Sequence, residues 1–234
     1  GTIGANGCNY QVMEFTGEGA KTLSISERMV LCNMAVEAGA KTGIFEPDEK
    51  AIEYLEAHGR KPKALFTSDP DAVYAREYTF DLSKIRPVVA KPDFVDNLVP
   101  AEEVRGVKID EAFLGSCNNG RIEDLRVGAS ILKGRHVAEK VLVVPASQTV
   151  YLQALKEGLI DTFIEGGAIV MNPNCSVCWG SCQGVIGENE VLISTGTRNF
   201  KGRAGHPSSK VYLGSAATVT ASAIKGEIAL ANDL

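Results

Sequence analysis

Residues 109–144 read IDEAFLGSCNNGRIEDLRVGASILKGRHVAEKVLVV, a run in which two kinds of apolar pattern alternate. The apolar segments at 109–114 and 141–144 have the length of buried strands, whereas 122–133 carries apolar side chains at helical spacing. A strand, a helix and a second strand in this order are typical of a βαβ unit in a parallel sheet. The stretch therefore predicts an α/β fold.

The same rhythm continues toward the carboxyl terminus. A helix expected at 148–157 is followed by strand-like segments within 163–171, at 190–195 and at 210–215, and a helix at 216–224 ends the series. Strands that alternate with helices in this way predict a mostly parallel sheet with helices on both faces.

A stretch rich in proline precedes this region. Five of the nine prolines lie between positions 62 and 100, where the strand pattern at 78–82 is the only convincing one. Such a composition favours a boundary between domains. We therefore expect two α/β domains, which comprise residues 1–84 and 85–234.

The first of these domains is expected to carry two helices. Ser24 and Glu27 have the spacing of a capping box, and apolar residues recur at helical spacing until Gly39. This pattern predicts a helix at 25–38 that is apolar nearly all round and largely buried. A second helix, at 48–59, is expected to face the solvent.

Composition limits the class of protein. Of the 234 residues, 44% are hydrophobic and 23% are charged, and no apolar run is long enough to cross a bilayer. The net charge is −5 and no basic run is present, so we expect neither a membrane nor a nucleic acid as partner. Six sparse cysteines favour a reducing, cytoplasmic setting over a disulfide scaffold. Because the first methionine is Met13, we expect the sequence to be incomplete.

Three cysteines follow two of the predicted strands. Cys117 comes after the strand at 109–114, and Cys175 and Cys178 form a C-x₂-C turn after the strand that ends near position 171. Loops at the carboxyl ends of parallel strands converge, so one metal centre could bind all three thiolates. Thiolates alone favour an iron–sulfur cluster or, with Cys182 as a fourth ligand, a zinc site. A redox C-x₂-C motif and three ordinary buried cysteines are the alternatives.

Three charged residues also stand out. Arg198 and Arg203 lie on the loop after the strand at 190–195, where their guanidinium groups could bind carboxylates, although two solvated surface charges would give the same pattern. Glu37 lies in the last turn of an apolar helix, the unfavourable end of the helix dipole for an acid. It is either a functional carboxylate or a solvated helix end.

Five segments together resemble the aconitase superfamily, in order and in spacing. They are ERMVLCNMAVEAGAKTGIF (27–45), LGSCNNGRIEDL (114–125), VVPASQTV (143–150), NPNCSVCWGSCQG (172–184) and TGTRNFKGRAG (195–205). Within that superfamily the chain is most similar to the carboxyl-terminal part of large subunits of the 3-isopropylmalate dehydratase and homoaconitase type. The resemblance covers essentially the whole chain and implies two α/β domains of aconitase type, with a cluster at the strand carboxyl ends of the second.

The resemblance also implies roles for individual residues. Cys117, Cys175 and Cys178 match the ligands of one [4Fe-4S] cluster per complete enzyme, and Cys182 matches no ligand. Glu37 matches a catalytic carboxylate that acts on the hydroxyl leaving the substrate.

The remaining matched positions lie around the cluster and the substrate. Asn33 and Asn119 match asparagines beside the cluster, and Arg198 and Arg203 match arginines that bind substrate carboxylates. Thr197 stands where the family has asparagine, so one contact near the cluster is expected to differ.

The activity implied is that of a hydro-lyase, which reversibly dehydrates and rehydrates a small-molecule hydroxy di- or tricarboxylate. The substrate expected first is 3-isopropylmalate, with homoaconitate, citrate and dimethylmalate as further candidates. The expected partners are a small swivelling subunit that carries the catalytic base and an amino-terminal domain that this sequence lacks, so we expect the chain alone to be inactive. A non-catalytic cluster-binding or regulatory module and a structural Cys₄ zinc protein are the alternatives.

Overall fold

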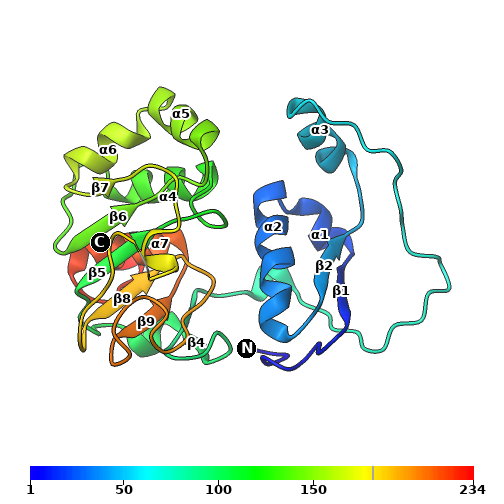
Figure 1. Cartoon of the computed structure of the whole chain (residues 1–234), viewed down its shortest axis with the longest axis horizontal. Helices are drawn as coiled ribbons and strands as arrows, with labels where there is room; N and C mark the ends of the chain where they lie inside the picture. The colour runs from blue at the N-terminus through cyan, green and yellow to red at the C-terminus, as the bar shows by residue number, and fades with distance from the viewer. Residues whose placement is uncertain (181) are drawn as a thin grey trace. The chain divides into compact units, whose positions relative to one another are not determined.

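The computed structural model describes residues 1–180 and 182–234. This part of the chain forms two compact units (Figure 1). The smaller unit comprises Ile3–Ile85, and the larger one comprises Arg86–Leu234 together with Gly1–Thr2. Each unit has its own β-sheet, with two strands in the smaller unit and seven in the larger.

The smaller unit is a βαβ unit. Strand β1 (Val12–Phe15) pairs in parallel with β2 (Thr42–Phe45), and the chain between them forms α1 (Glu18–Thr22) and α2 (Ile25–Met34). Two parallel strands require such a crossover because both run in the same direction. The buried apolar residues of this unit are Ala35, Ala38 and Ala40.

The helix expected at 25–38 is present, with a change of geometry at its end. Ser24 Oγ accepts a hydrogen bond from the N–H of Glu27 at 3.2 Å, and Glu27 Oε2 accepts one from the N–H of Ser24 at 2.7 Å. The capping box is therefore confirmed. The last turn is the 3₁₀ helix η1 (Ala35–Ala38), which Gly39 ends in the left-handed conformation with φ of 82°.

The expected burial of this helix is wrong. The buried side chain of α2 is that of Arg28, whose guanidinium pairs with Asp48 at 2.6 Å. Leu31 and Val36 are 37% and 52% exposed. Apolar residues surround the helix, but β2 and α3 of the smaller unit cover only part of it, so these side chains stay exposed.

The segment after β2 begins as expected and then differs. The solvent-facing helix expected at 48–59 is confirmed by α3 (Glu49–Ala57), none of whose side chains is buried. The strand expected at 78–82 is wrong, because a short 3₁₀ helix, η2 (Leu82–Lys84), begins within it. The carboxylate of Asp81 accepts a backbone N–H of η2 at 3.1 Å, a local bond that competes with strand pairing.

The larger unit is built on a sheet with the strand order β4-β3-β9-β8-β5-β6-β7 (Figure 1). Its strands are β3 (Val88–Ala90), β4 (Leu98–Pro100), β5 (Glu111–Leu114), β6 (Lys140–Val143), β7 (Ile169–Val170), β8 (Val191–Ser194) and β9 (Lys210–Leu213). The pairs among β5 to β9 are parallel, and β3 and β4 add an antiparallel edge. The α/β class and the mostly parallel sheet are therefore confirmed.

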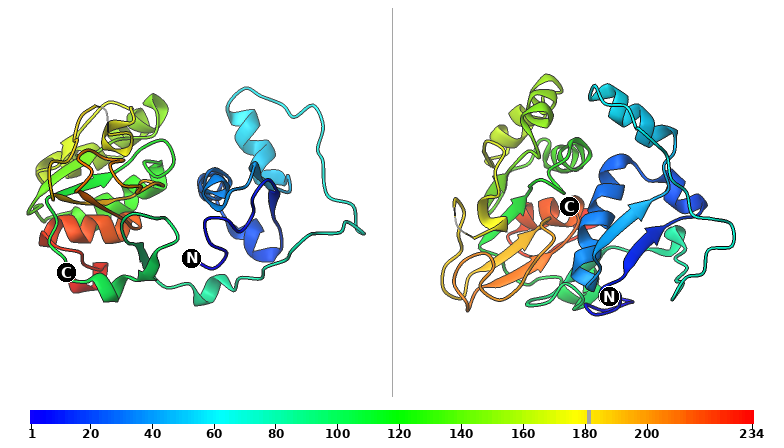
Figure 2. Two further views of the ribbon diagram at one scale, coloured as in Figure 1. Left: turned by 60° about the horizontal axis from the view of Figure 1, so that its bottom comes forward. Right: turned by 45° about the vertical axis from the view of Figure 1, so that its right-hand side comes forward.

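The α-helices in the described part of this unit lie on one face of the sheet (Figure 2). They are α4 (Ile122–Leu132), α5 (Gln148–Lys156), α6 (Leu159–Glu165) and α7 (Ala216–Lys225). All of them contribute side chains to one core, which Leu114 of β5 joins from the sheet. The adjacent Phe113 points to a second core, which loop residues Val177, Ile186 and Ala204 close from the other side.

The expectation of helices on both faces is therefore wrong. The segments that cover the second face follow β7 and β8, and they contain glycine, proline, asparagine and cysteine in place of a helical apolar pattern. Where these segments are described, turns and the short 3₁₀ helix at 176–178 determine their course, and no α-helix is present. Among the described residues no helix combines the length and the apolar character that a membrane span requires.

Candidate functional site

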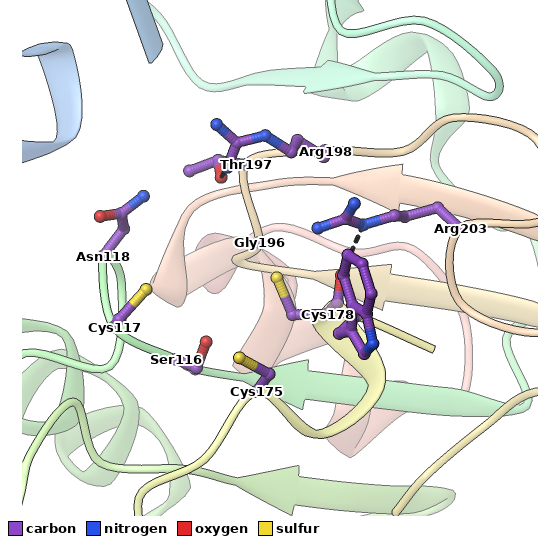
Figure 3. A pocket seen from close by; sticks show the side chains of 11 residues that line it. Ser116, Cys117, Asn118, Cys175, Cys178, Gly196, Thr197, Arg198 and Arg203 are labelled. Atoms are coloured by element: carbon purple, nitrogen blue, oxygen red, sulfur yellow. Dashed lines mark hydrogen bonds between the residues drawn. The ribbon is translucent and has the colours of Figure 1, made fainter. Parts of the chain in front are cut away.

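A pocket of about 110 Å³ opens at the carboxyl ends of the parallel strands β5, β7 and β8 (Figure 3). Its lining residues are Gly115, Ser116, Cys117, Asn118, Cys175, Cys178, Trp179, Gly196, Thr197, Arg198 and Arg203. The first four follow β5, the next three follow β7 and the last four follow β8. The pocket therefore lies where open parallel sheets bind their ligands.

A tight turn that contains the 3₁₀ helix η4 (Ser176–Cys178) presents two of the cysteines. Asn174 Oδ1 accepts the first backbone N–H of this helix at 2.6 Å, and the carbonyl of Cys175 accepts the N–H of Cys178 at 3.1 Å. Both thiols point into the pocket, where the thiol of Cys117 approaches from the opposite side (Figure 3). The structure thus brings the three cysteines predicted as ligands to one space.

The loop of Cys117 is tied to the end of β8. Thr195 Oγ1 donates to the carbonyl of Gly115 at 2.7 Å and accepts the N–H of Gly115 at 2.9 Å. The side-chain amide of Asn119 donates to the carbonyl of Thr195 at 2.5 Å. Asn119 therefore lies behind the pocket wall, where it joins two of the three loops.

Both predicted arginines line the pocket and are half-buried. Arg198 Nη1 donates to Thr197 Oγ1 at 2.9 Å, so the residue that departs from the family pattern orients a guanidinium. Arg203 Nε donates to the carbonyl of Cys178 at 2.7 Å, and its guanidinium lies 5.2 Å from the ring centroid of Trp179. Two cationic groups in one half-enclosed space favour an anionic ligand.

Burial governs the acidity of the innermost thiol. Desolvation raises the pKa of Cys178, and the neighbouring guanidinium of Arg203 opposes that rise. Because the thiol is neutral at ordinary pH in this setting, a metal that binds it has to displace a proton.

A zinc ion and an iron–sulfur cluster make different demands on their thiolate ligands. Four thiolates around one zinc ion lie about 3.8 Å apart, as Zn–S bonds of about 2.3 Å in a tetrahedron require. Among the described residues, no group of three or more histidine, cysteine or acidic side chains is arranged to hold a metal ion. Cys182 is outside the pocket lining, with its Sγ 3.4 Å from the carbonyl of Ser176.

Three thiols that border one space can each bind a different iron of a [4Fe-4S] cluster. Cys117, Cys175 and Cys178 can supply three ligands, which leaves one of the four irons without a protein thiolate. The donor set of the pocket therefore fits such a cluster.

The two other residues with predicted roles lie in the smaller unit. Asn33 is an exposed residue of α2, and Glu37 is a half-buried residue of η1. Glu37 is close to the carboxyl end of the helical segment, where the dipole disfavours an acidic group. Their roles stay predictions.

Besides two glycines, sequence analysis assigned no role to Ser116, Asn118 and Trp179 of the pocket. Ser116 and Asn118 flank a cysteine ligand candidate, so the same motif contained the signal for them. Trp179 follows Cys178 directly and is the only tryptophan of the chain, but its position in the wall depends on the fold of a distant loop.

The fold and the pocket define a class: α/β proteins in which three cysteines and two arginines line one pocket at the carboxyl ends of parallel strands. The chain belongs to the aconitase family, and the family model described as Aconitase family (aconitate hydratase) matches residues 1–106 and 95–226. The resemblance that the sequence motifs indicate is thereby confirmed.

Individual relatives support this assignment over nearly the whole chain. The chain is 50% identical over 231 residues to the 3-isopropylmalate dehydratase large subunit of Hydrogenobaculum sp. (strain Y04AAS1), covering 98% of this chain and 54% of the relative. It is 51% identical over 230 residues to the probable 3-isopropylmalate dehydratase large subunit of Methanothermobacter thermautotrophicus, covering 97% and 55%. It is 48% identical over 230 residues to the probable methanogen homoaconitase large subunit of that organism, covering 97% and 54%. The chain thus spans about half the length of the curated relatives it matches.

Proposed function

We propose that this chain is the cluster-binding part of the large subunit of a hydro-lyase. The reaction is the reversible dehydration and rehydration of a hydroxy di- or tricarboxylate, with 3-isopropylmalate as the first candidate and homoaconitate, citrate and dimethylmalate as further ones. The observation that carries the proposal is the meeting of three cysteines and two arginines in one pocket. The names of the relatives, 3-isopropylmalate dehydratase and homoaconitase large subunits, support the reaction class.

Cys117, Cys175 and Cys178 are the ligands of one [4Fe-4S] cluster in this proposal. When bound, such a cluster supplies an iron that acts as a Lewis acid on the departing hydroxyl group. The hydrogen bonds of Asn174 and Asn119 hold the loops of these cysteines in place.

The two arginines bind the carboxylates of the substrate. Both side chains line the pocket, and each guanidinium has five N–H donors in a planar fork that matches the geometry of a carboxylate. A charge-assisted hydrogen bond contributes about 1.5 to 3 kcal/mol, and a planar fork binds a carboxylate through two such bonds.

The rest of the active site comes from other parts in this proposal. Glu37 accepts or donates the proton at the departing hydroxyl, and Asn33 lies beside the cluster. A small swivelling subunit supplies the catalytic base, and an amino-terminal domain completes the large subunit. The chain by itself has no turnover because bound substrate lacks both a base and a closed pocket.

Anoxic reconstitution with iron and sulfide tests the ligand assignment. The chain should acquire visible absorption together with iron and acid-labile sulfide, and Cys117→Ser, Cys175→Ser and Cys178→Ser should each abolish it. Cys182→Ser is the matched control and should reconstitute normally. Stoichiometric zinc, or equal loss in the Cys182 variant, would overturn the assignment.

A complementation assay tests the activity. The reconstituted chain, combined with the amino-terminal part and the small subunit of a relative, should interconvert 3-isopropylmalate and its dehydrated enoate, followed by ultraviolet absorbance. The same chain without these parts should show none. An assembled, cluster-loaded enzyme that acts on no hydroxy di- or tricarboxylate would refute the proposed function.

A further inference from the structure

Trp179 has an unusual setting for a large aromatic side chain. It is 59% exposed and forms part of the wall of the pocket, directly after Cys178. The guanidinium carbon of Arg203 lies over its ring, 5.2 Å from the centroid. This distance is within the range of a cation–π contact, for which tryptophan is the best aromatic partner.

A second contact holds the same guanidinium. Arg203 Nε donates to the carbonyl of Cys178 at 2.7 Å, so the arginine contacts two successive residues of one turn. The hydrogen bond fixes one edge of the planar group, and the indole ring lies under its central carbon. The opposite edge, which carries Nη1 and Nη2, points into the pocket (Figure 3).

The backbones behind these side chains are packed closely as well. A Cβ added at Gly180 would lie 2.2 Å from the carbonyl oxygen of Arg203, so only glycine allows this approach. The N–H of Ile186 donates to the carbonyl of Ala204 at 3.1 Å, and the N–H of His206 donates to the carbonyl of Ile186 at 3.0 Å. The two loops are therefore joined by their main chains, and the side-chain contact is part of that junction.

A free arginine loses rotamer entropy when a ligand fixes it. An arginine that the protein already holds in place loses less entropy when the ligand binds, so the affinity for the ligand is higher. Arg203 has two supports of this kind, one from the peptide of Cys178 and one from the indole ring.

We propose that Trp179 is a positioning residue, which holds the guanidinium of Arg203 in the orientation that binds a substrate carboxylate. This inference rests on the proposed function insofar as Arg203 binds a carboxylate. The contact between the two side chains can be tested without that function.

The first experiment examines the contact in the chain alone by nuclear magnetic resonance with ¹⁵N-labelled arginine. The Nε–H signal of Arg203, identified by its loss in Arg203→Lys, should be shifted by the ring current and exchange slowly with water. Trp179→Ala should abolish the shift, and Trp179→Phe should retain part of it. Phe200→Ala removes a 41% exposed aromatic side chain from the same loop and should leave the signal unchanged. An Arg203 signal that is insensitive to Trp179→Ala would overturn the inference.

The second experiment measures kinetics in the assembled, cluster-loaded enzyme. Trp179→Ala should raise KM by about three- to tenfold with kcat within about twofold, because the contact orients a binding group and takes no part in bond breaking. Trp179→Phe should restore most of the affinity, and Trp179→Ala should add little in an Arg203→Lys background. Unchanged KM in Trp179→Ala would overturn the inference even with a confirmed contact. Absence of turnover in the parent enzyme, with the resonance results intact, would refute the proposed function and leave the contact standing.

Discussion

Glu111, the first residue of β5, is fully buried on the loop-covered face of the sheet. Lys140 forms an ion pair with its Oε2, while Oε1 faces Gly184, where an added Cβ would lie 2.9 Å away. Burial raises the pKa of this carboxyl group from 4.5 to about 7, with Lys140 opposing the rise and Glu190 adding to it. Ionisation of Glu111 in the folded chain is therefore unfavourable, and this should appear as a pH-dependent loss of unfolding free energy.

A raised pKa means that the folded chain binds this proton more tightly than the unfolded chain does. The stability due to the group is therefore complete below the unfolded pKa of 4.5 and is lost as the pH rises to about 7. One pKa unit corresponds to about 1.4 kcal/mol, so the shift amounts to about 3 kcal/mol of unfolding free energy.

Urea denaturation at about pH 5 and about pH 8.5 measures this effect. Between these two pH values, the unfolding free energy of the parent should fall by about 2 to 3 kcal/mol more than that of Glu111→Gln. At the higher pH, the variant should be more stable than the parent. Glu103→Gln, which neutralises an exposed carboxylate, is the control and should keep the parent's pH profile. The reasoning fails if Glu111→Gln loses stability with pH as steeply as the parent.

Two further predictions concern the assembled enzyme. Glu37→Gln should lower kcat by about 100-fold or more with little change in KM, and the melting temperature should not fall, since an acidic group at the carboxyl end of a helix is unfavourable. Steady-state kinetics and calorimetry check this, and a normal kcat would remove the catalytic role of Glu37. Arg198→Lys should raise KM by about tenfold or more because lysine lacks the planar fork. Substrate titration measures it, and an unchanged KM would exclude Arg198 as a carboxylate ligand.

Local patterns predicted the central part of the fold because they reflect local energetics. The strand, helix and strand between 109 and 144 appear as β5, α4 and β6, since each has the apolar period of its own secondary structure. The capping box of Ser24 and Glu27 likewise depends only on neighbouring residues. By contrast, β3 and β4 have three residues each and lie among prolines, so no local pattern marks them as strands. Their formation depends on a partner that is distant in sequence, because β3 pairs with β9.

Features that depend on distant parts of the chain could not be predicted. The burial of α2 depends on what covers the helix, and apolar spacing alone does not contain that information. Parallel strands predicted that the cysteine loops converge. The order of the strands was not predictable from local patterns: β8 lies beside β5, and β6 lies between β5 and β7. The contact between Trp179 and Arg203 joins two loops that have no sequence pattern in common.

Helices cover one face of the seven-stranded sheet and loops cover the other. The larger unit therefore has two regions that can evolve separately. Substitutions such as Leu125→Ile, on the helical side, are shielded from the pocket by the sheet itself and should change stability alone. Substitutions at Val177, Ile186 or Ala204 act on the core beneath the pocket loops, so a change of one methylene there should displace thiols and guanidinium groups together. A library that diversifies only the helical side should therefore yield stabilised variants with unaltered ligand preference, whereas altered preference should arise from the loop side.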